Sequence, residues 1–381
     1  MSAVASEAPA SEATWRTFAI VAAAIIIGQG SLSLVSAALP LHLSGIGVPE
    51  ARIGAEVGSA NLVGLVCTLL VGPLINRAGP HRLLRAGMGC YLVAAIGLLL
   101  VHGEVLVVLC RALQGCGTAL VMPSALTMAP RVVPLRPGAA LGVIGSLNNV
   151  SLAIAPPLGL WLYDQGGGPR LFGPAVACAG GGLLAGLLLP ALASTGQRAR
   201  GFGFDRRWIP TLAANGLLLA YFGGLLGYLS LSLAHPGAPN AGLYFAADAF
   251  GVMILRTPSG ALVDRYGARP AMAIGVVITL AGLGTLALTP SSATLIGGGI
   301  ITGLGAGLFI AGVLVTLAKR SGDHNRGTAM AMSAASLNFG ILAGSTISGP
   351  LYGAAGFGAV LLFGTVTTLA TLPFIFGDRE R

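Results

Sequence analysis

The sequence predicts an all-α membrane protein whose twelve transmembrane helices form two pseudo-symmetric six-helix bundles. Composition is the first reason, since 55% of the 381 residues are hydrophobic, 9% are charged and the mean hydropathy is +0.85. A soluble domain carries about 25% charged residues, so this chain has too little charge to cover a surface in water. The other two reasons are an internal repeat and the distribution of the arginines.

The repeat is clearest in two short basic segments. Gly72-Pro-Leu-Ile-Asn76-Arg77-Ala-Gly79-Pro-His-Arg82 recurs 188 positions later as Gly260-Ala-Leu-Val-Asp264-Arg265-Tyr-Gly267-Ala-Arg269. At the same offset Gln114-Gly115-Cys-Gly117 recurs as Thr302-Gly303-Leu-Gly305, and Ser146-Leu-Asn148 recurs as Ser336-Leu-Asn338 at 190. Matches in one order at one spacing indicate two homologous halves. We expect bundles at 1–193 and 208–381, joined by a polar linker at 194–207.

Apolar runs of about 20 residues are long enough to cross a bilayer as helices. The expected spans are 16–38, 53–75, 83–101, 105–127, 139–162, 171–193, 208–232, 241–263, 270–288, 294–317, 327–350 and 358–376. Residues 1–14 lack a basic start and the first run is too long for a signal peptide, so that run is expected to be retained.

The 21 Lys and Arg residues indicate the orientation. With the N-terminus inside, nearly all fall on the inner side, two (Arg52 and Arg170) fall outside, and two (Arg111 and Arg256) lie within spans. The net charge of +9 then reflects topology, and no nucleic-acid partner is needed. We expect both termini in the cytoplasm.

The repeated basic segments resemble the signature loops of the major facilitator superfamily, Gly-x-x-x-Asp-Arg-x-Gly-Arg-Arg, which follow helices 2 and 8. The second copy matches through Gly260, Asp264, Arg265, Gly267 and Arg269. The first keeps Gly72, Arg77, Gly79 and Arg82, but Asn76 replaces the acid. In this family the acid pairs with basic groups and helix ends when the cavity faces outward. The resemblance therefore implies a weaker gate in the first half.

Two further motifs extend the resemblance. Arg111-Ala-Leu-Gln114-Gly115 is similar to the family's Arg-x-x-Gln-Gly. Ala155-Pro156-Pro157-Leu-Gly159 is similar to the Gly-Pro-x-x-Gly-Gly motif of exporters, with alanine first. The likeness is to the bacterial efflux branch, including the arabinose-efflux-like permeases, and Arg256-Thr-Pro258 also fits that branch. It implies the major facilitator fold in the inner membrane of a bacterium.

Two charged residues inside spans are the leading site candidates. Arg111 lies about 10 Å inside its span, where a charge costs at least a few kcal/mol unless it faces water or a partner. Gln114 lies on the same helical face. Asp248 is the one acid well inside a span, and removal from water disfavours its charged form, so it can exchange protons near neutral pH. A fixed structural role is the alternative for each.

Other polar residues give weaker signals. Glu56 is a second candidate for titration, although wetting at the span end is the commoner role. Arg256 is a further candidate for substrate binding, and for anion uptake together with Arg111, although snorkelling is its commoner role. The other polar residues expected in spans include Gln29, Asn61, Asn148, Asn149, Asn215, Tyr221, Tyr228 and Asn338. Some should line a cavity and others should join helices. Pro156 and Pro157, with Gly159, are expected to allow a bend and close packing between the halves.

The expected function is secondary transport by alternating access, as a proton-coupled exporter (an antiporter) of a small organic molecule. No nucleotide-binding loop, cofactor or metal-ligand spacing is present, and the five cysteines are interpreted as buried apolar residues. The protein is expected to act as a monomer, not as an enzyme. Uptake of a small anion through Arg111 is an alternative, and a non-transporting sensor or assembly factor is another from a different class.

Overall fold

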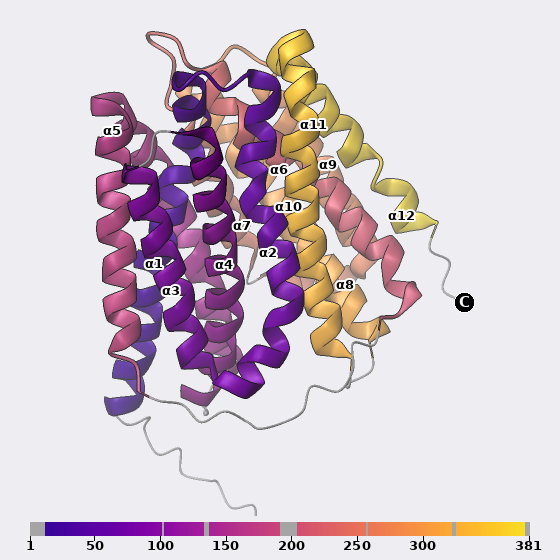
Figure 1. Ribbon diagram of the computed structural model, residues 1–381. Helices are drawn as coiled ribbons and strands as arrows, with labels where there is room; N and C mark the ends of the chain where they lie inside the picture. Colours follow the sequence, from indigo (N-terminus) through magenta and orange to yellow (C-terminus); the bar gives the residue numbers. More distant parts are fainter. Residues whose placement is uncertain are drawn as a thin grey trace, which may run out of the picture.

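The computed structural model describes residues 12–100, 103–132, 137–190, 204–256, 258–321 and 325–377. Every regular element in these ranges is a helix (Figure 1). The helices are α1 (Glu12–Gly45), α2 (Glu50–Ala78), α3 (Pro80–Leu100), α4 (Glu104–Val132), α5 (Pro137–Leu187), the short 3-10 helix η1 (Arg206–Trp208), α6 (Ile209–Ser232), α7 (Gly242–Arg256), α8 (Pro258–Tyr266), α9 (Ala268–Leu286), α10 (Ser292–Arg320), α11 (Arg326–Leu369) and α12 (Leu372–Phe376).

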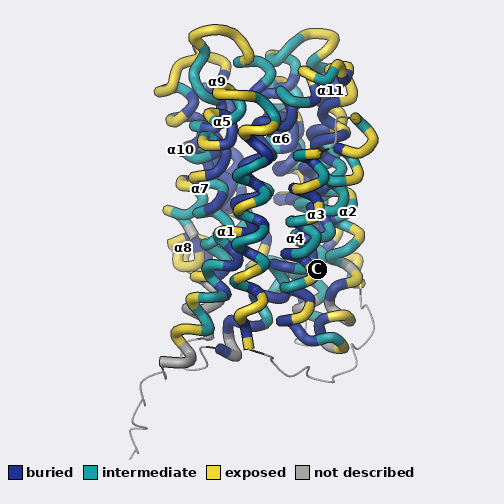
Figure 2. Tube along the Cα trace, turned by 60° about the vertical axis from the view of Figure 1, so that its left-hand side comes forward, coloured by how far each residue is buried: buried dark blue, intermediate teal, exposed yellow. Residues whose placement is uncertain are grey.

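Within the described ranges, eight of these helices are long and apolar enough to cross a membrane. Many large apolar side chains point outward from them, as Leu100, Val105 and Leu184 do with 69%, 71% and 65% of their surface exposed. Figure 2 shows exposed positions along the length of the helices as well as at their ends. Such a surface suits helices surrounded by lipid, where apolar side chains face an apolar solvent.

The two longest helices, α5 and α11, each contain a sharp reversal. Backbone angles leave the helical region at Gly166 and Gly167 in α5, and at Ala355 and Gly356 in α11. The end of α5 returns to the level of the start of α3, where the Arg85 guanidinium donates to the carbonyl oxygens of Gly186, Leu187 and Leu189 at 3.0, 3.2 and 2.6 Å. Figure 1 shows α11 rising to the upper end and descending to α12. Each reversal lies between the two spans expected in that part of the chain.

Within the span expected at 241–263, the structure describes α7 up to Arg256 and α8 from Pro258, and residue 257 lies outside the described residues. The connections expected at 101–105 and 288–294 do separate α3 from α4 and α9 from α10.

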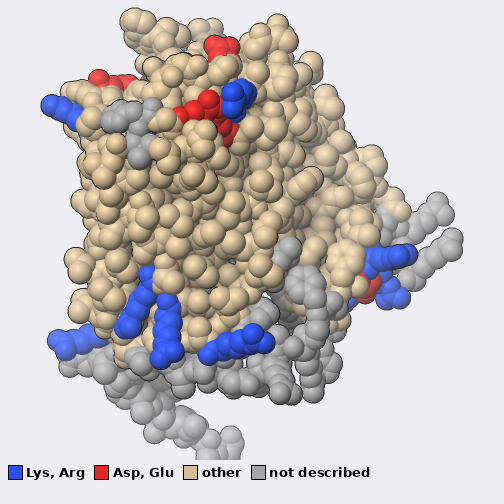
Figure 3. Space-filling model, in the orientation of Figure 1, with Lys and Arg blue, Asp and Glu red and all other residues tan. Residues whose placement is uncertain are grey.

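One end of the molecule, which we call the hinge end, contains both copies of the basic repeat. Gly79 links α2 to α3 with φ 85° and ψ 146°, and Gly267 links α8 to α9 with φ 90° and ψ 157°. Only glycine adopts these angles readily, so the two repeats form the same single-residue turn. Figure 3 shows arginines and lysines gathered at this lower edge, below a broad uncharged belt. The opposite end is called the far end.

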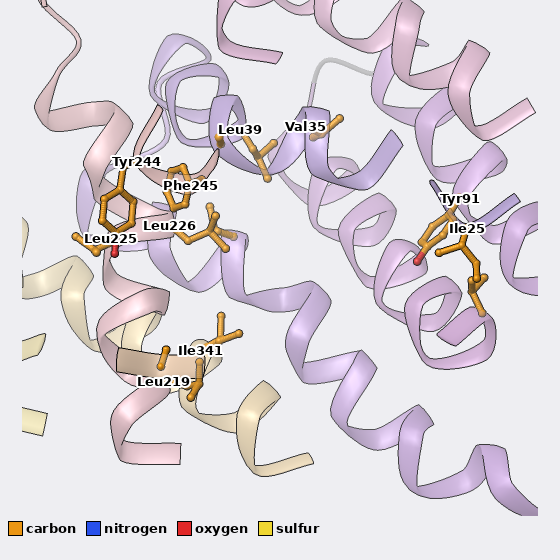
Figure 4. Close-up of a cluster of buried hydrophobic side chains, with 14 of the residues drawn as sticks. Ile25, Val35, Leu39, Tyr91, Leu219, Leu225, Leu226, Tyr244, Phe245 and Ile341 are labelled. Carbon is orange, nitrogen blue, oxygen red and sulfur yellow. The ribbon is translucent and has the colours of Figure 1, made fainter. Parts of the chain in front are cut away.

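Helices α1–α5 and α6–α12 form two groups that share one buried apolar core. Tyr244 and Phe245 of α7 lie beside Leu225 and Leu226 of α6, with Leu39 of α1 nearby (Figure 4). The rings of Tyr244 and Phe245 meet edge to face, 5.4 Å apart. Packing of this kind fixes the rotation of α7 and therefore the direction in which its polar residues point.

Candidate functional site

A cavity of about 300 Å³ lies between the two groups at mid-depth. Polar side chains from α1, α2, α4 and α5 form most of one wall, and apolar side chains from α6, α7, α10 and α11 form most of the other. Arg111 lines the first wall and Asp248 the second. The two charged residues singled out in the sequence therefore face one cavity from opposite groups.

Asp248 on α7 is 5% exposed and is held by a neighbouring helix. Its Oδ1 accepts a hydrogen bond from the Thr302 hydroxyl of α10 at 2.9 Å. The Thr302 oxygen lies 2.9 Å from the Tyr244 hydroxyl, which can donate to it. The three side chains thus form a short hydrogen-bonded chain from Tyr244 through Thr302 to the carboxylate. Because the Thr302 hydroxyl is neutral, the ionised carboxylate of Asp248 has no counter-ion among the described residues.

Arg111 on α4 is 2% exposed and is oriented from its own helix and from α2. Its Nη1 donates to Gln114 Oε1 at 2.8 Å, and its Nη2 donates to the Val57 carbonyl oxygen at 3.2 Å. The Nε of Arg111 and the Nε2 of Gln114 are buried without an acceptor in the described structure. No carboxylate pairs with Arg111 among the described residues, so this guanidinium retains donors and an unbalanced positive charge.

Two close helix–helix contacts, one in each group, occur at equivalent positions of the internal repeat. A side chain at Gly115 of α4 would overlap the backbone carbonyl of Ala60, and one at Gly303 of α10 would overlap that of Asp248. Gly115 and Gly303 are 188 positions apart, as are Ala60 and Asp248. The helix pair α2–α4 and the helix pair α7–α10 therefore pack in the same way, and Asp248 occupies a position that holds alanine in the first group.

The other polar residues singled out divide between the cavity and the helix contacts. Those that line the cavity are Gln29, Asn61, Asn148, Asn149, Tyr221 and Asn338. Asn215 instead joins α6 to α11 through Ser333 and Ser336, at 3.1 and 2.7 Å. Tyr228 lies at the far end, where it joins the two groups.

Glu56 is placed away from the cavity lining. Glu56 is 6% exposed, so the expectation of a wetted residue is wrong. Its carboxyl lies against that of Glu104, and Arg52 forms an ion pair with Glu104. Arg256 ends α7, but its side chain lies outside the described structure.

At the far end, contacts between α2, α6 and α11 join the two groups. The Tyr228 hydroxyl of α6 donates to the Glu50 carbonyl oxygen and accepts from the Gly54 amide, both at 2.8 Å. A side chain at Gly54 would overlap the Ser345 carbonyl of α11, and one at Gly349 would overlap the Ala51 carbonyl of α2. At the hinge half, α4 makes no comparable contact with α10 or α11 in the described residues.

The motif at Ala155–Gly159 packs in two directions. The Pro157 carbonyl oxygen accepts from Asn240 Nδ2 of the opposite group at 3.0 Å, and Pro157 also lies against Gly242 of α7. Gly159 instead packs on the Leu34 carbonyl of α1, within its own group. The helix continues through Pro156 and Pro157, and its non-helical angles occur later, at Gly166 and Gly167. The bend expected at the prolines stays a prediction.

The hinge motifs are placed at the surface of the hinge end. Arg77, Arg82, Asp264 and Arg265 are exposed, and Arg269 is half-buried. Arg265 lies over the Tyr266 ring, 5.3 Å from its centroid. Gly72 and Asn76 belong to α2, and the side chain of Asn76 is outside the described structure. Most of the expected linker, at 194–203, also lies outside the described residues.

Sequence reasoning missed Thr302 and Tyr244 as partners of Asp248. Thr302 was noted only as part of the repeat, where it aligns with Gln114. That alignment was a usable signal, because Gln114 contacts Arg111 in the first group as Thr302 contacts Asp248 in the second. Tyr244 lies one helical turn before Asp248 and therefore shares its face.

Comparisons with known proteins agree with this architecture. The profile of the Major Facilitator Superfamily matches residues 21–236 and 209–381. An uncharacterized MFS-type transporter of Mycobacterium tuberculosis, Rv1250, is 34% identical over 170 residues, which are 44% of this chain and 28% of that protein. Another from Salmonella typhimurium, STM4428, is 25% identical over 340 residues, covering 81% of this chain and 83% of that protein.

Among solved structures, a variant of the nucleoside transporter NupG matches with a TM-score of 0.77 at 13% identity, covering 96% of this chain and 98% of that one. At that identity the likeness concerns the fold alone. These relatives are named as transporters, although the chain spans less than a third of Rv1250, and the apolar helices indicate a multi-pass membrane protein. Because the profile covers most of its length, the chain belongs to the Major Facilitator Superfamily.

Proposed function

We propose that this protein is a secondary transporter that moves a small organic molecule by alternating access and couples that movement to protons. The observation that carries the proposal is the cavity between the groups, lined by Arg111 from one and Asp248 from the other. Charges at this depth are costly in a membrane protein and are typical of substrate or ion pathways. Relatives named as transporters support the same conclusion.

The proposed architecture has twelve spans in two bundles, 1–193 and 208–381, with the linker between them. Each of α5 and α11 supplies two spans, α7 with α8 supplies one, and α12 completes the last. The arginines at the hinge end support a cytoplasmic location for that end, since basic residues favour the inner side. By the resemblance noted above, the membrane is the inner membrane of a bacterium. We propose that the protein acts as a monomer.

In this orientation the structure corresponds to a state closed to the outside. Tyr228 and the contacts of Gly54 and Gly349 would form the outer gate. Opening that gate requires α2 to part from α6 and α11, while the hinge end closes. The exposed hinge residues Asp264 and Arg265 are free to form new pairs in the alternative state, and Asn76 lacks the charge to do so as strongly.

Asp248 is the proposed proton-coupling group. It is the one acid that lines the cavity among the described residues, and its only described hydrogen-bond donor is the neutral Thr302 hydroxyl. The ionisable groups that face it are Tyr244 on its own helix, Tyr221 on α6 and, across the cavity, Arg111. The two tyrosines carry no positive charge and Arg111 forms no described ion pair with Asp248, so protonation is the simplest way to neutralise it.

Two directions of transport follow from different observations. The likeness of Ala155–Gly159 to an exporter motif supports efflux in exchange for protons. The unpaired guanidinium of Arg111 supports a second candidate, a carrier that takes up a small anion. A sensor or assembly factor of the same fold is the third, but two uncompensated charges facing a cavity would destabilise a protein that binds nothing there.

The test of coupling uses Asp248→Asn, which keeps the size of the side chain but cannot titrate. Proton flux is measured in proteoliposomes on addition of each member of a panel of small organic acids, bases and neutral molecules. We expect the parent protein to show coupled flux with at least one compound and Asp248→Asn to lose it. The matched control is Asp164→Asn, an exposed acid at the far end, which should keep the flux. Unchanged coupled flux in Asp248→Asn would remove Asp248 from the mechanism.

A further inference from the structure

We infer that the substrate is an amphipathic organic anion, a monocarboxylate whose carboxylate binds at Arg111 and whose apolar body lies against the α6–α11 wall. The inference rests on the proposed transport function and names the substrate class of the same cavity. Three observations support it: the charge balance of Arg111, the unused hydrogen-bond donors around it, and the different character of the two cavity walls.

The charge of Arg111 is the first observation. A guanidinium stays protonated at any working pH, so it cannot lose its charge as a buried acid can. Arg111 is almost fully buried, and no described carboxylate pairs with it. Asp248, by contrast, becomes neutral by taking up one proton. Once Asp248 is protonated, Arg111 is left as the one charge on the described cavity lining, and an anion is the ligand that balances it.

The unused donors are the second observation. Besides the Nε of Arg111, the side-chain nitrogens of Gln114 and Asn149 are buried without an acceptor in the described structure. All three are N–H donors, and all belong to the α1–α5 group. Leaving a buried donor unpaired costs about 1–3 kcal/mol. Arg111 and Asn149 line the cavity, so a carboxylate bound there, with two acceptor oxygens, could accept from either, whereas Gln114 does not line the cavity and accepts from Arg111.

The opposite wall of the cavity indicates the chemical character of the ligand beyond its carboxylate. It consists mainly of Leu219, Phe222, Leu226, Val252, Ile310 and Ile341. This surface offers dispersion contacts but few hydrogen bonds, so an inorganic anion or a polyhydroxylated acid would leave it poorly covered. A volume of about 300 Å³ is at the small end for ligand pockets, which favours a compact acid with a single alkyl or aryl body.

The same charges predict how the substrate and the proton interact. An organic anion that enters the cavity places a second negative charge in the space that Asp248 faces. Its binding therefore favours protonated Asp248, and a protonated Asp248 favours its binding. The acid and the proton should cross together. Of the two transport functions proposed above, this coupling favours the carrier that takes up an anion together with a proton. It disfavours the exporter that exchanges its substrate for protons.

The test is binding by the purified full-length protein in lipid nanodiscs. The probes are straight-chain carboxylates from butanoate to decanoate, benzoate and phenylacetate, each compared with its own amide. Binding is measured as the rise in unfolding temperature across a concentration series, because a ligand stabilises the state that it binds. We expect at least one carboxylate, and not its amide, to stabilise the protein.

Arg111→Gln should weaken that carboxylate roughly 10- to 100-fold, as the loss of charge-assisted hydrogen bonds implies, while Arg111→Lys should retain part of the binding. Arg170→Gln, an exposed arginine at the far end, is the matched control and should bind as the parent does. Asp248→Asn should still bind, which also shows that a variant of the cavity folds.

Equal stabilisation by acids and amides, or equal loss in Arg111→Gln and Arg170→Gln, would overturn the inference. Stabilisation by none of the acids would overturn it as well. A different result would refute the proposed function and not the substrate class. In that case carboxylates would bind at Arg111, but proteoliposomes would show no coupled flux with them. Coupled flux with an amine, lost in Asp248→Asn, would keep the proposed function and refute the substrate class.

Discussion

Replacement of Gly54 by alanine should shift the protein away from the state seen here. The added Cβ would overlap the Ser345 carbonyl of α11 and would lie 2.7 Å from the Tyr228 hydroxyl. Both neighbours belong to the opposite group, so the strain falls on the far-end contact and not within the α1–α5 group. Overpacking of a well-packed contact costs about 1–3 kcal/mol. The ratio of closed to open far ends should therefore fall by roughly 5- to 150-fold.

The shift can be measured through access to the cavity. A single cysteine at Leu152, an apolar residue of the cavity wall, is introduced after replacement of the five native cysteines. Its rate of alkylation by an impermeant maleimide is then measured from each side of sealed vesicles. In Gly54→Ala the rate from the far-end side should rise and the rate from the hinge-end side should fall, because one gate opens as the other closes.

Gly89→Ala on α3 is the matched control, since an added Cβ there meets nothing within 4 Å. Alanine is also the better helix former by about 1 kcal/mol, so any general stiffening of a helix should appear in both variants. If Gly54→Ala reacts at the parent rate from both sides, the α2–α11 contact is not a gate and the proposed alternation is wrong at this end.

The remaining predictions concern topology and the hinge motifs. A cysteine at Ala238, in the far-end loop before α7, should react with an impermeant reagent from outside intact cells, whereas one at Gly203 should react only after permeabilisation. The reverse pattern would invert the proposed orientation. Asp264→Asn should impair transport far more than Asn76→Ala, because only Asp264 retains the charge of the motif. Equal losses of transport rate in the two variants would refute the charge-based gate.

The overall architecture was accessible from sequence because lipid restricts the backbone to helices of a predictable length. The runs of apolar residues located the helices, and the repeat located both hinge turns at Gly79 and Gly267.

The charges of the site were also accessible, because Arg111 and Asp248 stand out in apolar helices. What the sequence could not supply was the rotation of each helix. Glu56 is buried against Glu104, although its position near the end of α2 suggested contact with water. Tyr228 could equally have lined the cavity, but it reaches the backbone of α2 instead. Such differences depend on packing between helices distant in sequence, which periodicity within one helix does not encode.

The internal repeat explains why one charge of each sign faces the cavity. At the offset of 188, Asp248 aligns with Ala60, and Arg111 aligns with Gly299. Each group thus carries one charge where the other carries a small uncharged residue, although the supporting contacts at Gly115 and Gly303 are the same. A fully symmetric pair of halves would place two acids and two guanidiniums around about 300 Å³, where mutual pairing would satisfy them without a ligand. Because each charge occurs once and no described ion pair joins them, both stay available for the roles proposed above, Asp248 for a proton and Arg111 for a substrate.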